Sequence, residues 1–138
     1  GEAEFADAAT ALSANEKRAI EVAIGTVHRF HEAQRRGPVR VETAPGVVCE
    51  QVEVPLEAVG LYVPAGTAAL PSTAIMLGVP ARIAGVPRRV LCSPPRRDGR
   101  ADPAVLYAAR ACGVTDVFKL GGAQAVAAMA YGRETVPK

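Results

Sequence analysis

The sequence has few aromatic residues and almost no excess charge. Aromatic side chains make up 4% of its 138 residues and tryptophan is absent, so we expect a ligand to be held mainly by backbone and loops. A formal net charge of +2 gives no electrostatic footprint for nucleic acid. Paired arginines stand at predicted element ends and in loops, which favours solvated surface over a stripe that follows phosphates. These pairs are Arg35–Arg36, Arg88–Arg89 and Arg96–Arg97.

Long hydrophobic runs are also missing. Gly, Pro or Arg interrupts each apolar stretch well before the ~20 residues that a membrane-spanning helix needs. The first residues lack the basic and then apolar pattern of a secretory signal. We therefore expect a soluble, cytoplasmic protein with no membrane partner. With 49% of its residues apolar, a chain of this length can bury one moderate core, or one core with an appendage.

Cysteine is too sparse to predict a disulfide framework. The three cysteines, Cys49, Cys92 and Cys112, are widely spaced, and no CxxC pair occurs among them. We expect reduced, structural thiols, with Cys92 in an apolar strand and Cys112 near a helix end. Neither has an evident basic partner of the kind that a catalytic thiol needs.

The first part of the chain predicts one long helix from Ser13 to Arg36. Ser13 and Glu16 have the spacing of a capping box, and Gly37–Pro38 ends the helical pattern. The segment 1–11 is rich in alanine and acidic residues, which indicates a frayed helix or part of an earlier one. The apolar stripe of the long helix consists of Ile20, Ala23, Ile24, Val27 and Phe30.

Between Val39 and Leu56 the apolar period changes toward two, which predicts a β-hairpin or two edge strands. The turn signal is Ala44–Pro45–Gly46. Beyond the turn, three valines share one parity, and Gln51 and Glu53 have the other. These valines are Val48, Val52 and Val54.

A strand–loop–helix unit then repeats three times. Strands are predicted at 59–63, 89–93 and 115–120, and helices at about 72–84, from Asp102–Pro103 to Gly113, and at 123–131. Short apolar strands that alternate with helices predict a parallel sheet covered on both faces. The fold class is therefore α/β, a Rossmann-like β-α-β-α-β-α unit of an incomplete domain. We divide the chain into an N-terminal helix and hairpin segment, 1–57, and a partial nucleotide-binding domain, 58–138.

Two glycine-bearing loops follow predicted strands, at Gly66 and at Gly121–Gly122. Parallel sheets bind ligands at the carboxyl ends of their strands, where helix starts attract phosphate. Neither loop fits GxGxxG or GxxxxGK[ST], and for each glycine taken alone a tight turn is the favoured interpretation. Two such loops at equivalent strand ends favour a binding rim.

Two side chains at this rim are candidate ligand contacts. Tyr62 stands one residue before the end of its predicted strand, where its ring can reach the rim or pack within the sheet. Gln124 is polar within a run of small and apolar residues in the first turn of the last helix. Its amide can face a ligand or make a helix-cap contact, and we favour the ligand.

No catalytic or metal-binding set is evident in these residues. His28 and His31 are three apart on the long helix, but no local Cys, Asp or Glu completes a metal site. We interpret them as ordinary histidines at the edge of the helix surface. The glutamates around the hairpin, Glu50, Glu53 and Glu57, form no acid/base couple.

Five ordered blocks of the chain resemble the histidinol dehydrogenase family, over roughly Val54 to Lys138. The long helix and the hairpin are compatible with that family, although their sequences are less specific to it. The blocks are VGLYVPAGT (59–67), PSTAIMLGVPARIAG (71–85), VLCSPP (90–95), LYAARACGVTDVF (106–118) and GGAQAVAAMAYGRETVPK (121–138).

The resemblance implies a homodimeric enzyme that oxidises L-histidinol to L-histidine through an enzyme-held aldehyde, with two NAD. It further implies a zinc ion that positions the substrate, a histidine base and a glutamate that helps to activate water. The family's NAD contacts within this stretch are the tyrosine of GLYVP and the glutamine of GGAQ. These correspond to Tyr62 and Gln124.

The chain departs from the family pattern in three ways. Ala65 stands where the family usually has a first glycine, which affects how closely a cofactor approaches the backbone, and Val86 stands where cysteine is frequent. The family's GPGN segment, zinc ligands and Glu-His pair fall beyond Lys138. We therefore expect these 138 residues to be a fragment that does not turn over histidinol alone. A non-catalytic nucleotide-binding or interaction module, or another NAD- or phosphate-binding enzyme, is the alternative.

Overall fold

A parallel three-stranded sheet forms the centre of the molecule. The computed structural model describes residues 1–65, 68–114, 116–133 and 135–138. The sheet consists of β3 (Ala58–Tyr62), β4 (Arg88–Cys92) and β5 (Asp116–Phe118), in the order β3-β4-β5. The helices α3 (Pro71–Ile83) and α4 (Pro103–Ala111) connect successive strands, and α5 (Ala123–Tyr131) follows the last. The predicted β-α-β-α-β-α order is confirmed.

The third strand is shorter than predicted. The sequence pattern extends it from Thr115 to Leu120, whereas β5 ends at Phe118, and Thr115 lies outside the described residues. The Leu120 N–H donates to the Phe118 carbonyl at 3.0 Å. This contact closes a three-residue turn, so the chain leaves the sheet directly after Phe118.

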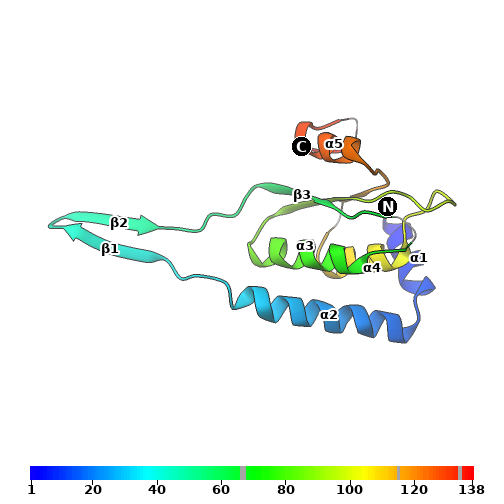
Figure 1. The fold of residues 1–138 in the computed structure, drawn as a ribbon, viewed down its shortest axis with the longest axis horizontal. Helices are drawn as coiled ribbons and strands as arrows, with labels where there is room; N and C mark the ends of the chain where they lie inside the picture. Colours follow the sequence, from blue (N-terminus) through cyan, green and yellow to red (C-terminus); the bar gives the residue numbers. More distant parts are fainter. Residues whose placement is uncertain (66–67, 115, 134) are drawn as a thin grey trace.

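Alternate side chains of the strands supply two separate cores. Leu61, Val63 and Leu91 face α3 and α4, and they are at most 5% exposed. Val90 and Cys92 face the opposite way and pack against Ala125 and Ala128 of α5. Figure 1 shows α5 on one side of the sheet and α2, α3 and α4 on the other. The expected cover on both faces is confirmed.

The segment 1–33 forms two helices. The first is α1 (Glu2–Ala11), which packs its buried Ala8 toward α4, and the second is α2 (Ala14–Glu32). The predicted capping box is present at the start of α2. The Glu16 N–H donates to Ser13 Oγ at 3.3 Å, and the Ser13 N–H donates to Glu16 Oε2 at 2.8 Å.

Two details of α2 differ from the prediction. The helix ends at Glu32 rather than Arg36, because the Gln34 and Arg35 amides donate to carbonyls three residues back and tighten the last turn. Phe30, which we placed in the apolar stripe, is 65% exposed. At 100° per residue Phe30 points about 80° from the direction of Ile20, while the half-buried His31 is nearer to the centre of the stripe.

An antiparallel hairpin projects from the body between α2 and β3 (Figure 1). It consists of β1 (Val39–Ala44) and β2 (Val47–Gln51), so the predicted hairpin is confirmed. Pro45 and Gly46 form its turn, where Gly46 has a φ of 77° and the Gly46 N–H donates to Glu42 Oε1 at 2.8 Å. The sequence pattern gives Val52 and Val54 the same parity as Val48. Both lie beyond the end of β2, so they are not part of the hairpin face that carries Val48.

The three cysteines are free thiols that differ in environment. Cys92 and Cys112 are fully buried, and burial raises the pKa of both thiols. They fit the structural role that the sequence predicts. Cys49 differs, because it is exposed on the hairpin and supports no core. None of the helices in the described ranges is both long and apolar enough to cross a membrane.

The close packing of α3 on α4 yields a test with a matched control. A methyl group at Gly78 of α3 would lie 2.7 Å from Cys112 Cβ, whereas one at Gly25 of α2 would meet Arg29 Nη1 at 3.9 Å. We expect Gly78→Ala to lower the free energy of unfolding by about 1–3 kcal/mol through overpacking. Gly25→Ala should raise it by about 0.5–1 kcal/mol. Urea denaturation compares the two variants, and equal effects would contradict the described helix contact.

Candidate functional site

The carboxyl ends of the three strands lie at one edge of the sheet. Beyond the regular ladder, the Val63 N–H donates to the Cys92 carbonyl at 2.9 Å, and the Ser93 N–H donates to the Phe118 carbonyl at 3.1 Å. These bonds keep the chain segments in register as they leave the sheet. The loops after β3, β4 and β5 are therefore neighbours and form a rim. Gly66, which we predicted in this rim, lies outside the described residues.

Tyr62 connects the first and third of these loops. Its ring is half-buried on the α5 side of the sheet, so the position supports both alternatives left open by the sequence. The Tyr62 hydroxyl accepts a hydrogen bond from the Gly122 N–H at 3.0 Å. The side chain thus packs within the sheet and also reaches the rim.

Gln124 lies beside the same glycine. Gln124 is exposed, and a methyl group added at Gly122 would meet its Oε1 at 2.6 Å. Gly122 also has a φ of 73°, which L side chains rarely adopt. Position 122 therefore favours glycine through its backbone angle, whereas the exposed end of the Gln124 side chain can move away from an added methyl group. The structure brings the two predicted site residues together around Gly122.

The neighbouring Gly121 fixes the loop against the end of β4. A methyl group at Gly121 would lie 2.3 Å from Pro94 Cγ, so this residue has no space for a side chain. Sequence analysis missed the contact with Pro94. Its sequence signal was weak and consisted of the position of Pro94 after β4, which matches that of Pro64 after β3. Nothing in the sequence pairs Pro94 with a loop some 27 residues later.

The rim offers donors that suit an anionic or polar ligand. Gly122 caps α5 without a side-chain hydrogen bond, and the start of a helix is the positive end of its dipole. A hollow of about 790 Å³ lies between the loops after β3 and β4, and Tyr62, Gly122 and Gln124 are not among its lining residues. Its lining includes Ala65, Pro95, Arg96, Arg97 and Asp98. The arginine pair that we interpreted as solvated surface is exposed here and borders this hollow.

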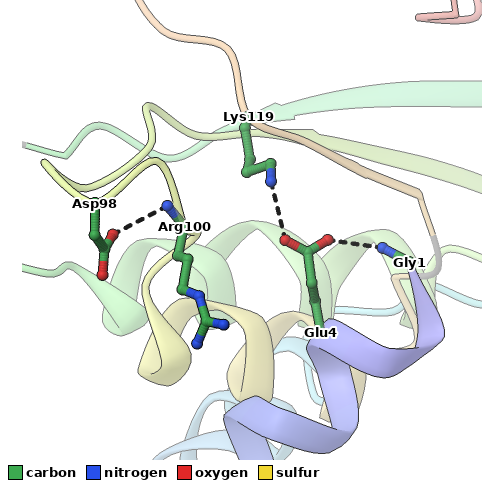
Figure 2. A network of polar contacts seen from close by, with 5 residues as sticks. All are labelled: Gly1, Glu4, Asp98, Arg100 and Lys119. Carbon is green, nitrogen blue, oxygen red and sulfur yellow. Dashed lines mark hydrogen bonds and ion pairs between the residues drawn. The ribbon is translucent and has the colours of Figure 1, made fainter.

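A second hollow, of about 310 Å³, lies between α1 and the loop that precedes α4. Figure 2 shows two separate sets of contacts at this hollow, one around Glu4 and one between Asp98 and the backbone N–H of Arg100. Glu4 Oε2 accepts from the Gly1 ammonium at 2.8 Å, and Glu4 Oε1 accepts from Lys119 Nζ at 3.0 Å. Asp98 accepts from the Arg100 N–H at 3.0 Å. The Glu4–Lys119 contact attaches α1 to the end of β5, and we interpret all of these contacts as structural.

The Gly1 ammonium, and after it Lys119, holds the pKa of Glu4 at about 2. Because this pKa is depressed, the stabilisation from ionised Glu4 is present above its usual pKa of 4.5 and is lost as the pH falls toward 2. Glu4 remains partly exposed, so this contribution is small.

The histidines lie away from the rim. His31 Nδ1 is 2.7 Å from Gln34 Oε1 near the end of α2. Within the described part of the chain, no three His, Cys, Asp or Glu side chains come together as a metal ion would require. The residues present here thus do not form a zinc site.

Comparison with known proteins relates the whole chain to one family. The family model described as histidinol dehydrogenase matches residues 1–138. A histidinol dehydrogenase of Xanthomonas axonopodis is 60% identical over 136 residues, which cover 99% of this chain and 32% of that protein. One from Xylella fastidiosa (strain Temecula1) is 60% identical over 135 residues. The crystal structure of histidinol dehydrogenase from Elizabethkingia anophelis superimposes with a TM-score of 0.95 at 38% identity, covering 100% of this chain and 32% of that one. The chain spans about a third of the length of these relatives.

The contact of Lys119 with α1 can be tested by titration. We expect Lys119→Met to raise the pKa of Glu4 toward the usual 4.5, because the variant removes one of the two cations beside the carboxylate. Glu16 is the internal control, since its pKa is lowered by hydrogen bonds from Ser13 and should not move. Carboxyl carbon shifts measured by NMR against pH report both groups. An unchanged Glu4 pKa would show that Lys119 does not contact it.

Proposed function

Since this chain belongs to the histidinol dehydrogenase family, we propose that the full-length protein oxidises L-histidinol to L-histidine through an aldehyde that stays on the enzyme. The reaction would use two NAD. The names of the relatives support the oxidoreductase activity and its place in histidine biosynthesis. We further propose that the protein works as a homodimer in the cytoplasm, without nucleic acid or membrane partners.

The role that we assign to residues 58–138 is to hold NAD at the carboxyl edge of the sheet, with residues 1–57 as an attached helix and hairpin segment. The observation that carries this proposal is the arrangement of Tyr62 and Gln124 around Gly122. The Tyr62 oxygen accepts from the Gly122 amide, so the hydroxyl hydrogen is available to a ligand. The Gln124 amide, exposed at the start of α5, supplies both a donor and an acceptor.

NAD, when bound, supplies the hydride acceptor, and the described residues bind and orient it. The hydrogen bond from Gly122 to Tyr62 fixes the loop after β5 relative to β3, so both contacts are positioned before the cofactor arrives. Fixed polar groups reduce the cost of ordering on binding. Ala65 adds one methyl group where the family usually has glycine, and the half-buried position next to the hollow accommodates it.

No residue of this chain is assigned to catalysis or to zinc. The described donors do not fit a zinc ion, so we assign the metal ligands, the histidine base and the glutamate to the remaining part of the family's polypeptide. The 138 residues alone should consequently be inactive.

Assay of the protein extended to the length of its relatives tests this function. With L-histidinol, NAD and zinc, we expect NADH to form, and the 138-residue chain under the same conditions should form none. Absence of NADH from the extended, folded protein would overturn the proposed activity. Turnover by the 138 residues alone would overturn the assignment of the chemistry to the rest of the polypeptide.

The cofactor contacts have a separate test in the extended protein. We expect Tyr62→Phe and Gln124→Ala each to weaken NAD binding roughly 2- to 12-fold, the range that corresponds to one lost hydrogen bond. Tyr131→Phe is the matched control, because Tyr131 is 79% exposed and is the last residue of α5, at the other end of that helix from Gly122. Titration calorimetry measures the three dissociation constants. Wild-type affinity in both rim variants would show that the cofactor binds elsewhere.

A further inference from the structure

The projecting hairpin is amphipathic across its two strands. Directly paired residues of an antiparallel ladder lie on the same face, and Val41 pairs with Cys49 while Arg40 pairs with Glu50. One face therefore carries mainly apolar side chains. The other face carries charges, with Arg40 Nε 2.7 Å from Glu50 Oε1. The apolar face comprises Val39, Val41, Val47 and Cys49.

This apolar face has no cover within the described part of the chain. Every residue of β1 and β2 is exposed, and Val39, Val41 and Val47 are each about half exposed, at 51%, 50% and 52%. A two-stranded hairpin alone is at best marginally stable in water. An amphipathic hairpin with an open apolar face is a surface that another part of a protein covers.

Exposed apolar side chains also occur between the hairpin and the body of the molecule. The segment 52–56 carries three apolar side chains that are 62–77% exposed, Val52, Val54 and Leu56. It leads into a groove of about 660 Å³ between the ends of α2 and α3. Val54, Leu56 and Ile83 contribute apolar lining there, and His31 and Glu53 contribute polar groups. We call the apolar hairpin face, segment 52–56 and this groove the arm surface.

We propose that the arm surface is the docking site for the part of the family's polypeptide that these 138 residues do not represent. The relatives have about two thirds of their length outside the matched region, which is enough chain to cover it. The surface combines a flat hairpin face with a concave groove at its base. A segment that follows both features fits it, whereas contact between two hairpins would leave the groove open. The proposal does not depend on where NAD binds.

The Cys49 thiol reports directly on this docking. Cys49 is on the apolar face, and Cys92 and Cys112 are buried. Trypsin releases it in a peptide, 41–82, that has no other cysteine. We expect a maleimide reagent to modify Cys49 rapidly in the 138-residue chain at every protein concentration. In the extended protein the reaction should be at least about tenfold slower, because local opening must precede it.

Two opposite outcomes would overturn the proposal. Equal rates of Cys49 modification in the two proteins would show that nothing covers the arm surface. Protection that rises with concentration in the 138-residue chain, together with a dimer on size-exclusion chromatography, would show that a second copy covers it instead.

Two valines of similar exposure on opposite faces provide matched variants. Val41 is 50% exposed on the apolar face and Val48 is 45% exposed on the charged face opposite Glu42. In the extended protein, Val41→Lys should restore rapid Cys49 modification, while Val48→Lys should keep the protection. If Val41→Lys fails to fold at the extended length, Val41→Ala gives the smaller change in the same direction. Equal loss of protection in both lysine variants, or in neither, would refute the assigned face.

Discussion

The structure depends on the pairing of β4 with a parallel strand on each side. Leu91 and Val90 point to opposite faces of this central strand, so helices have to cover both. The connections α3 and α4 cover one face and α5 covers the other. The same backbone pairing aligns the three strand ends and thus determines where the loops meet. Stability and the position of the rim follow from one set of hydrogen bonds.

At that rim, Tyr62 belongs both to the core and to the proposed binding site. The ring belongs to the core beneath α5, while its oxygen fixes the Gly122 amide. Gly121 has no space for a side chain against Pro94, and Gly122 has a φ of 73° that L side chains rarely adopt. A loop held in this way presents the start of α5 in a fixed position, with the exposed Gln124 beside it. Such pre-organisation is what a cofactor site requires when aromatic stacking surfaces are scarce.

Local chemistry made much of this fold predictable. The Ser13–Glu16 capping box and the Asp102 cap formed as expected, because their donors and acceptors are within three residues of each other. Tyr62 and Gln124 could be placed at one edge of the sheet from strand ends alone. Their junction at Gly122 could not, since that hydrogen bond joins residues 60 positions apart. The exposure of Phe30 and Cys49 and the face of Val48 also depend on which elements pack nearby, and periodicity does not reveal those neighbours.

These residues form a body with its own sheet and core, together with the projecting hairpin of β1 and β2, which the body leaves exposed. The body presents the proposed NAD contacts, and in our proposal the rest of the family's polypeptide contributes the chemistry. The most direct measurement is a crystal structure of the extended protein with NAD. We predict that the cofactor lies at the carboxyl edge of β3, β4 and β5, within hydrogen-bonding distance of Tyr62 and Gln124. NAD bound at another edge, with neither residue in contact, would contradict it.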